Sequence, residues 1–182
     1  MSFRYEIRLS GEGGQGLVLA GKILAEAAAV YDDLNATQSQ SYGPEARGGA
    51  SRSEVIISDE DIDYPKAVHI DLLLALTQES CDRYHSDLKK EGIMLVDSDA
   101  VTRVPQGSFR IIKVPIIQLA RDKAGRALVA NIVALGLIAG IARIVSEKSV
   151  RAAIEARVPK GTEELNLKAF AVGLQEAQAI MK

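Results

Sequence analysis

Short apolar runs with the period of a strand alternate along this chain with longer runs of helical composition. Between Tyr5 and Ser10 every second side chain is apolar, the pattern of a strand with one buried face. Residues 17–30 are mostly Ala, Leu, Ile, Glu and Lys without proline, which favours a helix. Residues 72–76 are continuously apolar over the length of a strand, as expected for a central parallel strand covered on both faces.

The same criteria predict the remaining elements. Further strands are expected at residues 34–38, 51–58, 93–96 and 109–114, and further helices at residues 78–88, 118–124, 128–142, 146–157 and from 162 onward. We expect residues 51–58 to have one more solvent-exposed face and to follow the second loop as a hairpin-like or mixed-sheet addition. Residues 89–92 are expected to end a helix at Gly92, Ser146 and Thr162 to begin helices, and Asp99 to cap a turn.

Strand and helix alternate over two thirds of the chain, and the last third is helical. This order predicts a three-layer, Rossmann-like α/β fold with a mostly parallel or mixed sheet and a helical C-terminal third. The chain has 182 residues, 47% of them hydrophobic, and no low-complexity linker divides it. We therefore expect one domain, residues 1–182.

A glycine-rich loop, Gly11-Glu12-Gly13-Gly14-Gln15-Gly16, lies between the first expected strand and the first expected helix. Glycine permits positive φ and a close approach of backbone N–H groups to a ligand, and the helix N-terminus that follows favours an anion. A phosphate or pyrophosphate is the ligand that this arrangement suits. The spacing G-x-G-x-x-G also occurs in tight turns that bind no ligand. The alternative to a phosphate site is therefore a strand-to-helix turn without a ligand.

A dinucleotide ligand is disfavoured. Such a site needs an acidic residue about twenty positions further on, at the end of the second strand, to hold the ribose hydroxyls. Asp32 and Asp33 are at about that distance but precede the second expected strand, which is followed by polar, uncharged residues.

A second loop, residues 39–50, combines hydroxyls, amides and Arg47 among glycines. It follows the second strand, and loops after strand carboxyl ends line one crevice in an α/β sheet, so we expect it to face the glycine loop. Arg47 suits a phosphate or carboxylate. A surface arginine or an intersubunit ion pair explains it equally well.

Composition argues against several classes of function. A net charge of −2, a pI near 5.8 and 4% aromatic residues give no reason to expect nucleic acid or an anionic membrane as partner. The single cysteine, Cys81, is expected to be a small buried helix residue, and it cannot hold an iron–sulfur cluster. His69 and His85 are too isolated for a zinc site, and the acids at 59–61 suit a solvated turn.

The localisation expected from the sequence is cytoplasmic. No apolar signal segment follows the N-terminus. The apolar stretch at residues 127–142 is shorter than the roughly 20 residues of a membrane span. We expect a helix buried inside the protein or between subunits, in which Asn131 has a structural hydrogen bond.

Three stretches together resemble the gamma subunit of 2-oxoacid:ferredoxin oxidoreductases. They are residues 11–21, residues 41–49 (Ser-Tyr-Gly-Pro-Glu-Ala-Arg-Gly-Gly) and residues 129–136 (Val-Ala-Asn-Ile-Val-Ala-Leu-Gly). The likeness covers nearly the whole chain and is strongest to the 2-oxoglutarate type. Pyruvate, branched-chain and indolepyruvate types remain alternatives.

The resemblance implies a subunit without activity of its own in a thiamine-dependent oxidative decarboxylation that yields acyl-CoA. Thiamine diphosphate and iron–sulfur clusters then belong to partner subunits (alpha, beta and a ferredoxin-like delta), and ferredoxin accepts the electrons. This chain has no Gly-Asp-Gly thiamine motif and no cluster cysteines, which agrees with that division. The resemblance implies no catalytic residue or metal ligand here.

Coenzyme A is the ligand that the resemblance implies for the two loops. Its phosphates are expected at the glycine loop, with the second loop beside the thiamine pocket or its subunit. The residues concerned are Gly11, Gly13, Gly14, Gln15, Gly16, Ser41, Tyr42, Arg47, Gly48 and Gly49. A purely structural assembly subunit is the competing hypothesis, and a free nucleotide-dependent enzyme is a weaker one because no acid–base pair stands out.

Overall fold

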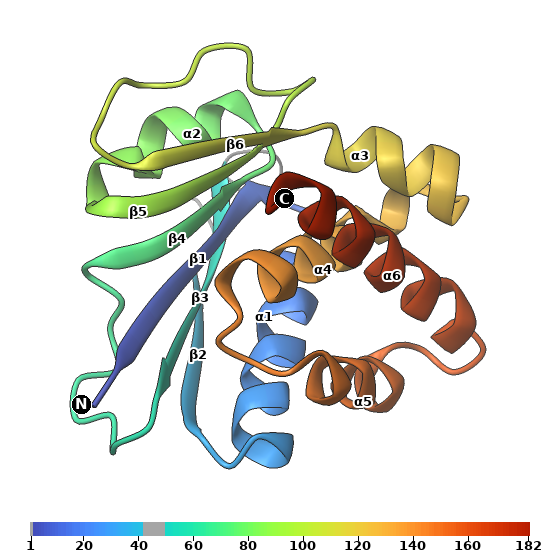
Figure 1. Ribbon diagram of the computed structural model, residues 1–182, viewed down its shortest axis with the longest axis horizontal. Coiled ribbons are helices and arrows are strands. Elements are labelled where there is room, and N and C mark those ends of the chain that lie inside the picture. Colours follow the sequence, from blue (N-terminus) through green and yellow to red (C-terminus); the bar gives the residue numbers. More distant parts are fainter. Residues whose placement is uncertain (1, 42–49) are drawn as a thin grey trace.

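A mixed six-stranded sheet forms the middle layer of the molecule (Figure 1). The computed structural model describes residues 2–41 and 50–182. Within them the strands are β1 (Arg4–Glu12), β2 (Asn35–Ser41), β3 (Ala50–Ser58), β4 (Ile70–Ala75), β5 (Leu88–Asp97) and β6 (Arg110–Val114), in the order β2-β3-β1-β4-β5-β6. β1, β4, β5 and β6 run parallel, and β3 is antiparallel to its neighbours β1 and β2. The predicted three-layer fold with a mostly parallel or mixed sheet is confirmed.

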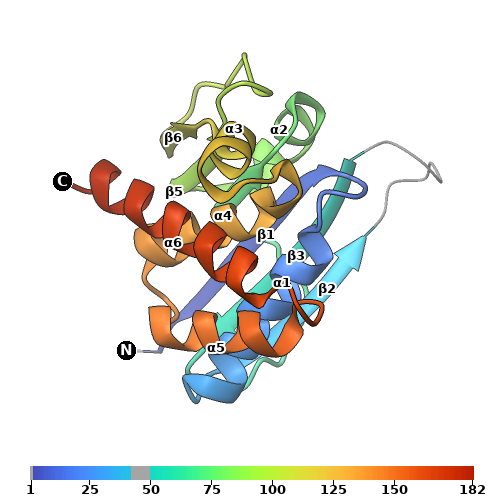
Figure 2. The same ribbon diagram turned by 90° about the vertical axis from the view of Figure 1, so that its right-hand side faces the viewer.

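The two faces of the sheet are covered unequally. The helices are α1 (Leu17–Glu26), α2 (Gln78–Tyr84), α3 (Ile116–Leu119), α4 (Ala130–Ala142), α5 (Glu147–Arg157) and α6 (Glu163–Ile180). Shorter turns of helix are η1 (Ala27–Tyr31), η2 (His85–Asp87), η3 (Ala120–Ala124) and η4 (Ala127–Val129). Helices α1 and α3 to α6 cover one face, and α2 packs on the other (Figures 1 and 2).

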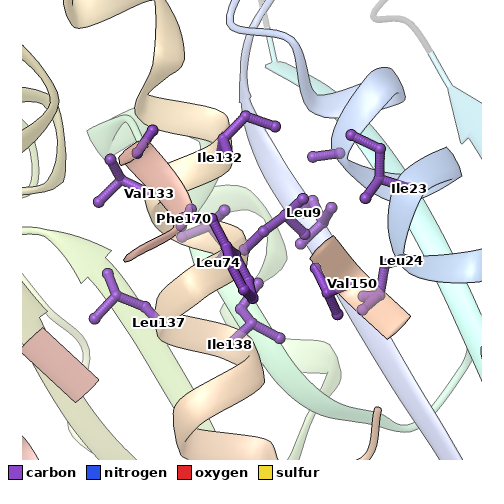
Figure 3. Packing of buried hydrophobic residues seen from close by; sticks show 14 of the residues in the cluster. Leu9, Ile23, Leu24, Leu74, Ile132, Val133, Leu137, Ile138, Val150 and Phe170 are labelled. Atoms are coloured by element: carbon purple, nitrogen blue, oxygen red, sulfur yellow. The ribbon is translucent and has the colours of Figure 1, made fainter. Parts of the chain in front are cut away.

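The larger core lies between the sheet and the helices of the C-terminal third. Leu9 and Leu74 point from the sheet toward Phe170 of α6 and the apolar side chains of α4 (Figure 3). The next residues of β4, Leu73 and Ala75, belong to a smaller core under α2. The continuous apolar run of β4 is therefore covered on both faces, as predicted.

Helix α4 is the buried helix that the apolar stretch predicts. All but three of its thirteen residues are buried, and it packs along α6. The contact is closest where Gly136 meets Gly173, since a Cβ on Gly136 would lie 2.3 Å from the carbonyl oxygen of Phe170. Within residues 2–41 and 50–182, no helix is both long enough and apolar enough to cross a membrane.

Two predicted segments are wrong in their secondary structure. Residues 89–92 do not end a helix, because α2 ends at Tyr84 and the chain enters β5 at Leu88. β5 pairs with β4 at Leu88 and again from Ile93 onward, and residues 89–92 form an irregularity between these pairs in which Glu91 has φ +65°. The second strand runs on to Ser41, so residues 39–41 belong to β2 and not to a loop, since they pair with β3.

The prediction of one wetter face on the third strand is also wrong. Glu54 is buried in β3, where its carboxylate accepts from Arg8 Nε at 2.8 Å. A charged residue that alternates with apolar residues predicts a solvent-exposed face. Here an opposite charge on the neighbouring strand allows the carboxylate to be buried.

The capping predictions are met in part. Ser146 Oγ accepts from Ser149 N at 3.2 Å and caps α5, as predicted. Thr162 precedes α6, but its hydroxyl donates to the carbonyl of Pro159 at 2.6 Å and caps nothing. The turn after β5 is held by the buried carboxylate of Asp97, which accepts from the backbone N–H of Asp99 at 3.0 Å, so Asp99 is the capped residue and not the cap.

Candidate functional site

The glycine loop forms a closed turn between β1 and α1 at the carboxyl edge of the sheet. The side chain of Gln15 folds back, and its Oε1 accepts from Glu12 N at 2.7 Å. Gln15 N in turn donates to the carbonyl of Glu12 at 3.3 Å. Gly11 is a buried residue of β1, and a Cβ there would lie 2.2 Å from Gln15 Oε1, so packing within the turn accounts for this glycine.

Gly13 and Gly14 form the open tip of the turn. Both are exposed, and a Cβ added to either would meet no atom of the described residues within 4 Å. Gly14 has φ +91°, which favours glycine for conformational reasons. Gly13 has no positive φ, so within residues 2–41 and 50–182 neither backbone conformation nor packing requires glycine there. The missing side chain leaves the backbone accessible from outside.

The N-terminus of α1 lies directly behind that tip. Gly16 is its N-cap with φ +74°, no side chain caps the helix, and no acidic residue stands in its first turn. The first backbone N–H groups of a helix have no partner within the helix, and they carry the positive end of its dipole. This end of α1 is therefore suited to an anion.

A cavity of about 250 Å³ adjoins the turn. It is lined by Gly14, Gln15, Leu76, Ile117, Ala127, Leu128 and Ala130. Leu128 of η4 is 72% exposed, so an apolar surface lies next to the polar backbone of the loop. The only charged side chain at residues 11–16 is that of Glu12, so a phosphate would be bound by backbone N–H groups and by cations from elsewhere.

The second loop begins and ends at the same edge of the sheet. Ala50, the first residue of β3, pairs with Glu12 at the end of β1, and Ser41 is the exposed last residue of β2. Tyr42, Arg47, Gly48 and Gly49 lie outside the described residues. Their predicted roles stay predictions.

Asp32 lies at the other end of the sheet, before β2, and has a structural role. Its carboxylate accepts from Ser146 N at 2.6 Å and from the hydroxyls of Ser146 and Ser149 at the start of α5. Asp33 is exposed in the same turn, with φ +55°. Neither residue is near the glycine loop, in agreement with the sequence argument against a dinucleotide.

A buried arginine on the α2 face of the sheet was missed by the sequence analysis. Arg8 is 2% exposed and is bound by Glu54 and by Asp87, and its guanidinium lies 5.2 Å from the ring centre of Tyr84. Its position between Ile7 and Leu9 marked it only as facing away from the larger core. Arg52 also pairs with Glu54, so the two arginines and two acids balance one another and join β1 and β3 to η2.

The remaining candidates for chemistry are the single thiol and possible metal ligands. Cys81 is fully buried in α2, as predicted, and burial together with the nearby Asp82 carboxylate raises the pKa of its thiol to about 11. It is therefore neutral and inert at physiological pH. Over residues 2–41 and 50–182, no three His, Cys, Asp or Glu side chains gather into a possible metal site.

Comparison with known proteins places this geometry in a family. Residues 6–176 match the family model described as pyruvate ferredoxin/flavodoxin oxidoreductase. The chain belongs to this family. It is 50% identical over 182 residues to the 2-oxoglutarate synthase subunit KorC of Methanocaldococcus jannaschii, covering 99% of this chain and 97% of that one.

Solved structures agree with the gamma-type assignment. The gamma subunit of a keto/oxoacid ferredoxin oxidoreductase from Geobacter sulfurreducens superposes with a TM-score of 0.90 at 54% identity, over 97% of this chain and 98% of that one. A 2-oxoglutarate:ferredoxin oxidoreductase from Magnetococcus marinus has the same fold over 31% of its length, with a TM-score of 0.86 at 22% identity and 97% coverage of this chain. The predicted resemblance to oxidoreductase gamma subunits is confirmed.

Proposed function

We propose that this chain is the gamma subunit of a 2-oxoglutarate:ferredoxin oxidoreductase and that its glycine loop holds the diphosphate of coenzyme A. The observation that carries the proposal is the open backbone at Gly13 and Gly14, in front of the uncapped N-terminus of α1. The substrate follows the full-length relative, which is named a 2-oxoglutarate synthase subunit. The Magnetococcus enzyme, whose structure contains coenzyme A, supports the choice of ligand.

The proposal divides the reaction between chains. Partner subunits supply thiamine diphosphate, the iron–sulfur clusters and the contact with ferredoxin, because this chain has one cysteine and that thiol is buried. This chain contributes the binding of coenzyme A and a surface for assembly. A cytoplasmic location remains the expectation for the complex.

The chemistry of the loop sets what it can contribute to coenzyme A binding. Backbone N–H groups at residues 13–19 are neutral donors, and the exposed Glu12 beside them would repel a diphosphate. Cations from Arg47 or from a partner subunit would offset that repulsion. The apolar lining at Leu76, Ile117 and Leu128 suits an uncharged part of the ligand next to its phosphates.

Gly13→Val tests the proposal with little risk to the fold, because Gly13 has open space around its Cα and no positive φ. A valine there covers the exposed backbone of the turn. In the reconstituted complex we expect the KM for coenzyme A to rise on the order of tenfold or more while kcat for 2-oxoglutarate oxidation at saturating coenzyme A is kept. Steady-state kinetics with varied coenzyme A measures both.

Ala29→Val is the matched control, since Ala29 is exposed near the far end of the same helical segment. It should leave both constants unchanged. A KM for coenzyme A that does not respond to Gly13→Val would rule out binding at this loop.

An assembly subunit is the second candidate. The apolar lining next to the loop, which includes the exposed Leu128, also suits an apolar side chain of a partner subunit. If that is the role of the loop, Gly13→Val will reduce co-purification with the partner subunits and leave the coenzyme A dependence of the assembled complex unchanged.

A further inference from the structure

Asn131 connects the glycine loop to the buried helix α4, although the two are 115 positions apart in the sequence. Its Nδ2 donates to the carbonyl of Gly16 at 3.0 Å. Its Oδ1 accepts from Ile132 N at 3.0 Å, within the first turn of α4. The sequence predicts a structural hydrogen bond for Asn131 in the helix, whereas its link to the loop depends on the fold.

One amide thus serves the N-termini of two helices, neither of which has a side-chain cap at its N-cap residue. Gly16 is the N-cap of α1, and its carbonyl also accepts from Ala20 N at 3.1 Å, the bond that begins the helix. Asn131 is 5% exposed, so its donor and acceptor depend on these two partners. An amide provides both, whereas a carboxylate provides only the acceptor.

The contact is close enough to fix the position of Gly16. A Cβ on Gly16 would lie 2.5 Å from Asn131 Nδ2, so the two residues leave no space for a side chain between them. Asn131 itself cannot shift easily, since the residues after it in α4 are packed in the larger core (Figure 3). The core therefore determines where α1 begins.

We infer that Asn131 is a positioning residue that holds the glycine loop and the first N–H groups of α1 in the arrangement that binds the diphosphate of coenzyme A. The inference rests on the proposed function for the identity of the ligand. The hold on the loop rests only on the contacts to Gly16 and Ile132.

Two variants separate the donor from the acceptor. Asn131→Leu has a similar volume and neither hydrogen bond. Asn131→Asp keeps the acceptor for Ile132 N, at a helix N-terminus that favours a carboxylate, and loses the donor to Gly16. Because the leucine variant is neutral, it also shows whether an effect of the aspartate variant is only repulsion of the phosphates.

The first measurement is amide hydrogen exchange of residues 12–19 in the full chain without coenzyme A. We expect faster exchange in both variants, since the tie to α4 is lost. The second is steady-state kinetics of the reconstituted complex, where we expect the KM for coenzyme A to rise about tenfold with kcat unchanged. A role confined to stability would lower the unfolding midpoint without moving that KM.

Asn166 offers a matched control. It is also a buried asparagine near a helix start, and its Nδ2 donates to the carbonyl of Thr162, the N-cap of its own helix, at 2.9 Å. Asn166→Leu should lower stability and leave both the exchange of residues 12–19 and the KM for coenzyme A unchanged.

Two results would overturn the inference. If exchange of residues 12–19 is unchanged in Asn131→Leu, Asn131 does not hold the loop. If exchange rises while the KM for coenzyme A stays the same, the hold has no role in binding. In that case Gly13→Val separates the two hypotheses. If Gly13→Val raises the KM for coenzyme A, the binding site at the loop stands and only the role of Asn131 is lost.

Discussion

At the scale of single residues, the four glycines of the loop differ in why glycine occupies each position. Gly11 is enclosed by the side chains of Gln15, Leu17 and Leu76, Gly14 has a positive φ, and Gly16 has both a positive φ and the contact with Asn131. Among the described residues, nothing constrains Gly13 in these ways. A glycine motif read as one signal for a phosphate therefore contains three residues that the turn needs in any case, which makes Gly13 the most informative position for a test.

Asp32 gives a prediction about pH. Burial alone would raise the pKa of its carboxyl, but hydrogen bonds from Ser149 and Ser146 outweigh burial and lower that pKa. Since the pKa is lower in the folded state, the stabilisation is fully present above the unfolded value of about 3.9 and is lost as the pH falls through the folded value. Asp32→Asn should therefore lower the urea midpoint of unfolding at pH 6. The difference in midpoint between this variant and the unchanged protein should become smaller toward pH 3.

The neighbouring acid provides the comparison for that series. Asp33→Asn changes the same charge in the same turn, at φ +55°, a conformation that asparagine tolerates. Its urea midpoint should stay close to that of the unchanged protein at pH 6. Equal losses for Asp32→Asn and Asp33→Asn would mean that net charge, and not the bonds to α5, stabilises the fold.

At the scale of elements, strands in the middle of the sheet were predictable and the polar ends of strands were not. The strand at β4 and the turn into α1 follow from local apolar patterns. The carboxyl end of β2 is polar and is extended because it pairs with β3. The amino end of β5 is also polar, and it is placed by the pair of Leu88 with Ile70 that precedes its irregular residues 89–92. Local composition carries no record of that pairing.

The pair α4 and α6 gives a prediction about packing. A Cβ on Gly136 would lie 2.3 Å from the carbonyl of Phe170, and one on Gly173 would lie 2.0 Å from the carbonyl of Val133. Gly136→Ala must therefore push the two helices apart, and we expect a loss of roughly 1–3 kcal/mol in the free energy of unfolding. Denaturant titration measures it.

Gly13→Ala controls for the general effect of adding a methyl group at a glycine, because its Cβ would meet nothing within 4 Å. Its stability should match that of the unchanged protein or exceed it slightly. If Gly136→Ala unfolds at the same denaturant concentration as Gly13→Ala, α4 and α6 accommodate the added methyl group, and the close contact between them does not contribute to stability.

At the scale of the whole molecule, the proposed function predicts that this chain needs partner subunits for turnover. Its only thiol is buried and neutral, and no metal-binding group of side chains exists over residues 2–41 and 50–182. We expect the purified chain to reduce no ferredoxin with 2-oxoglutarate and coenzyme A present, and the reconstituted complex to do so. Spectroscopic assay of ferredoxin reduction checks both, and turnover by the chain alone would contradict the division of labour between subunits.

The sequence by itself determined the class of fold, the place of the glycine loop and the family. These depend on hydrophobic patterns that repeat over a few residues or on short contiguous sequence motifs. Tertiary structure decided which side chains meet. Arg8 and Glu54 are 46 positions apart, and Asn131 and Gly16 are 115 apart. Hydrophobic periodicity records which way a residue faces but not what it faces, because the partner depends on the order of the strands and on the path of α4 through the core.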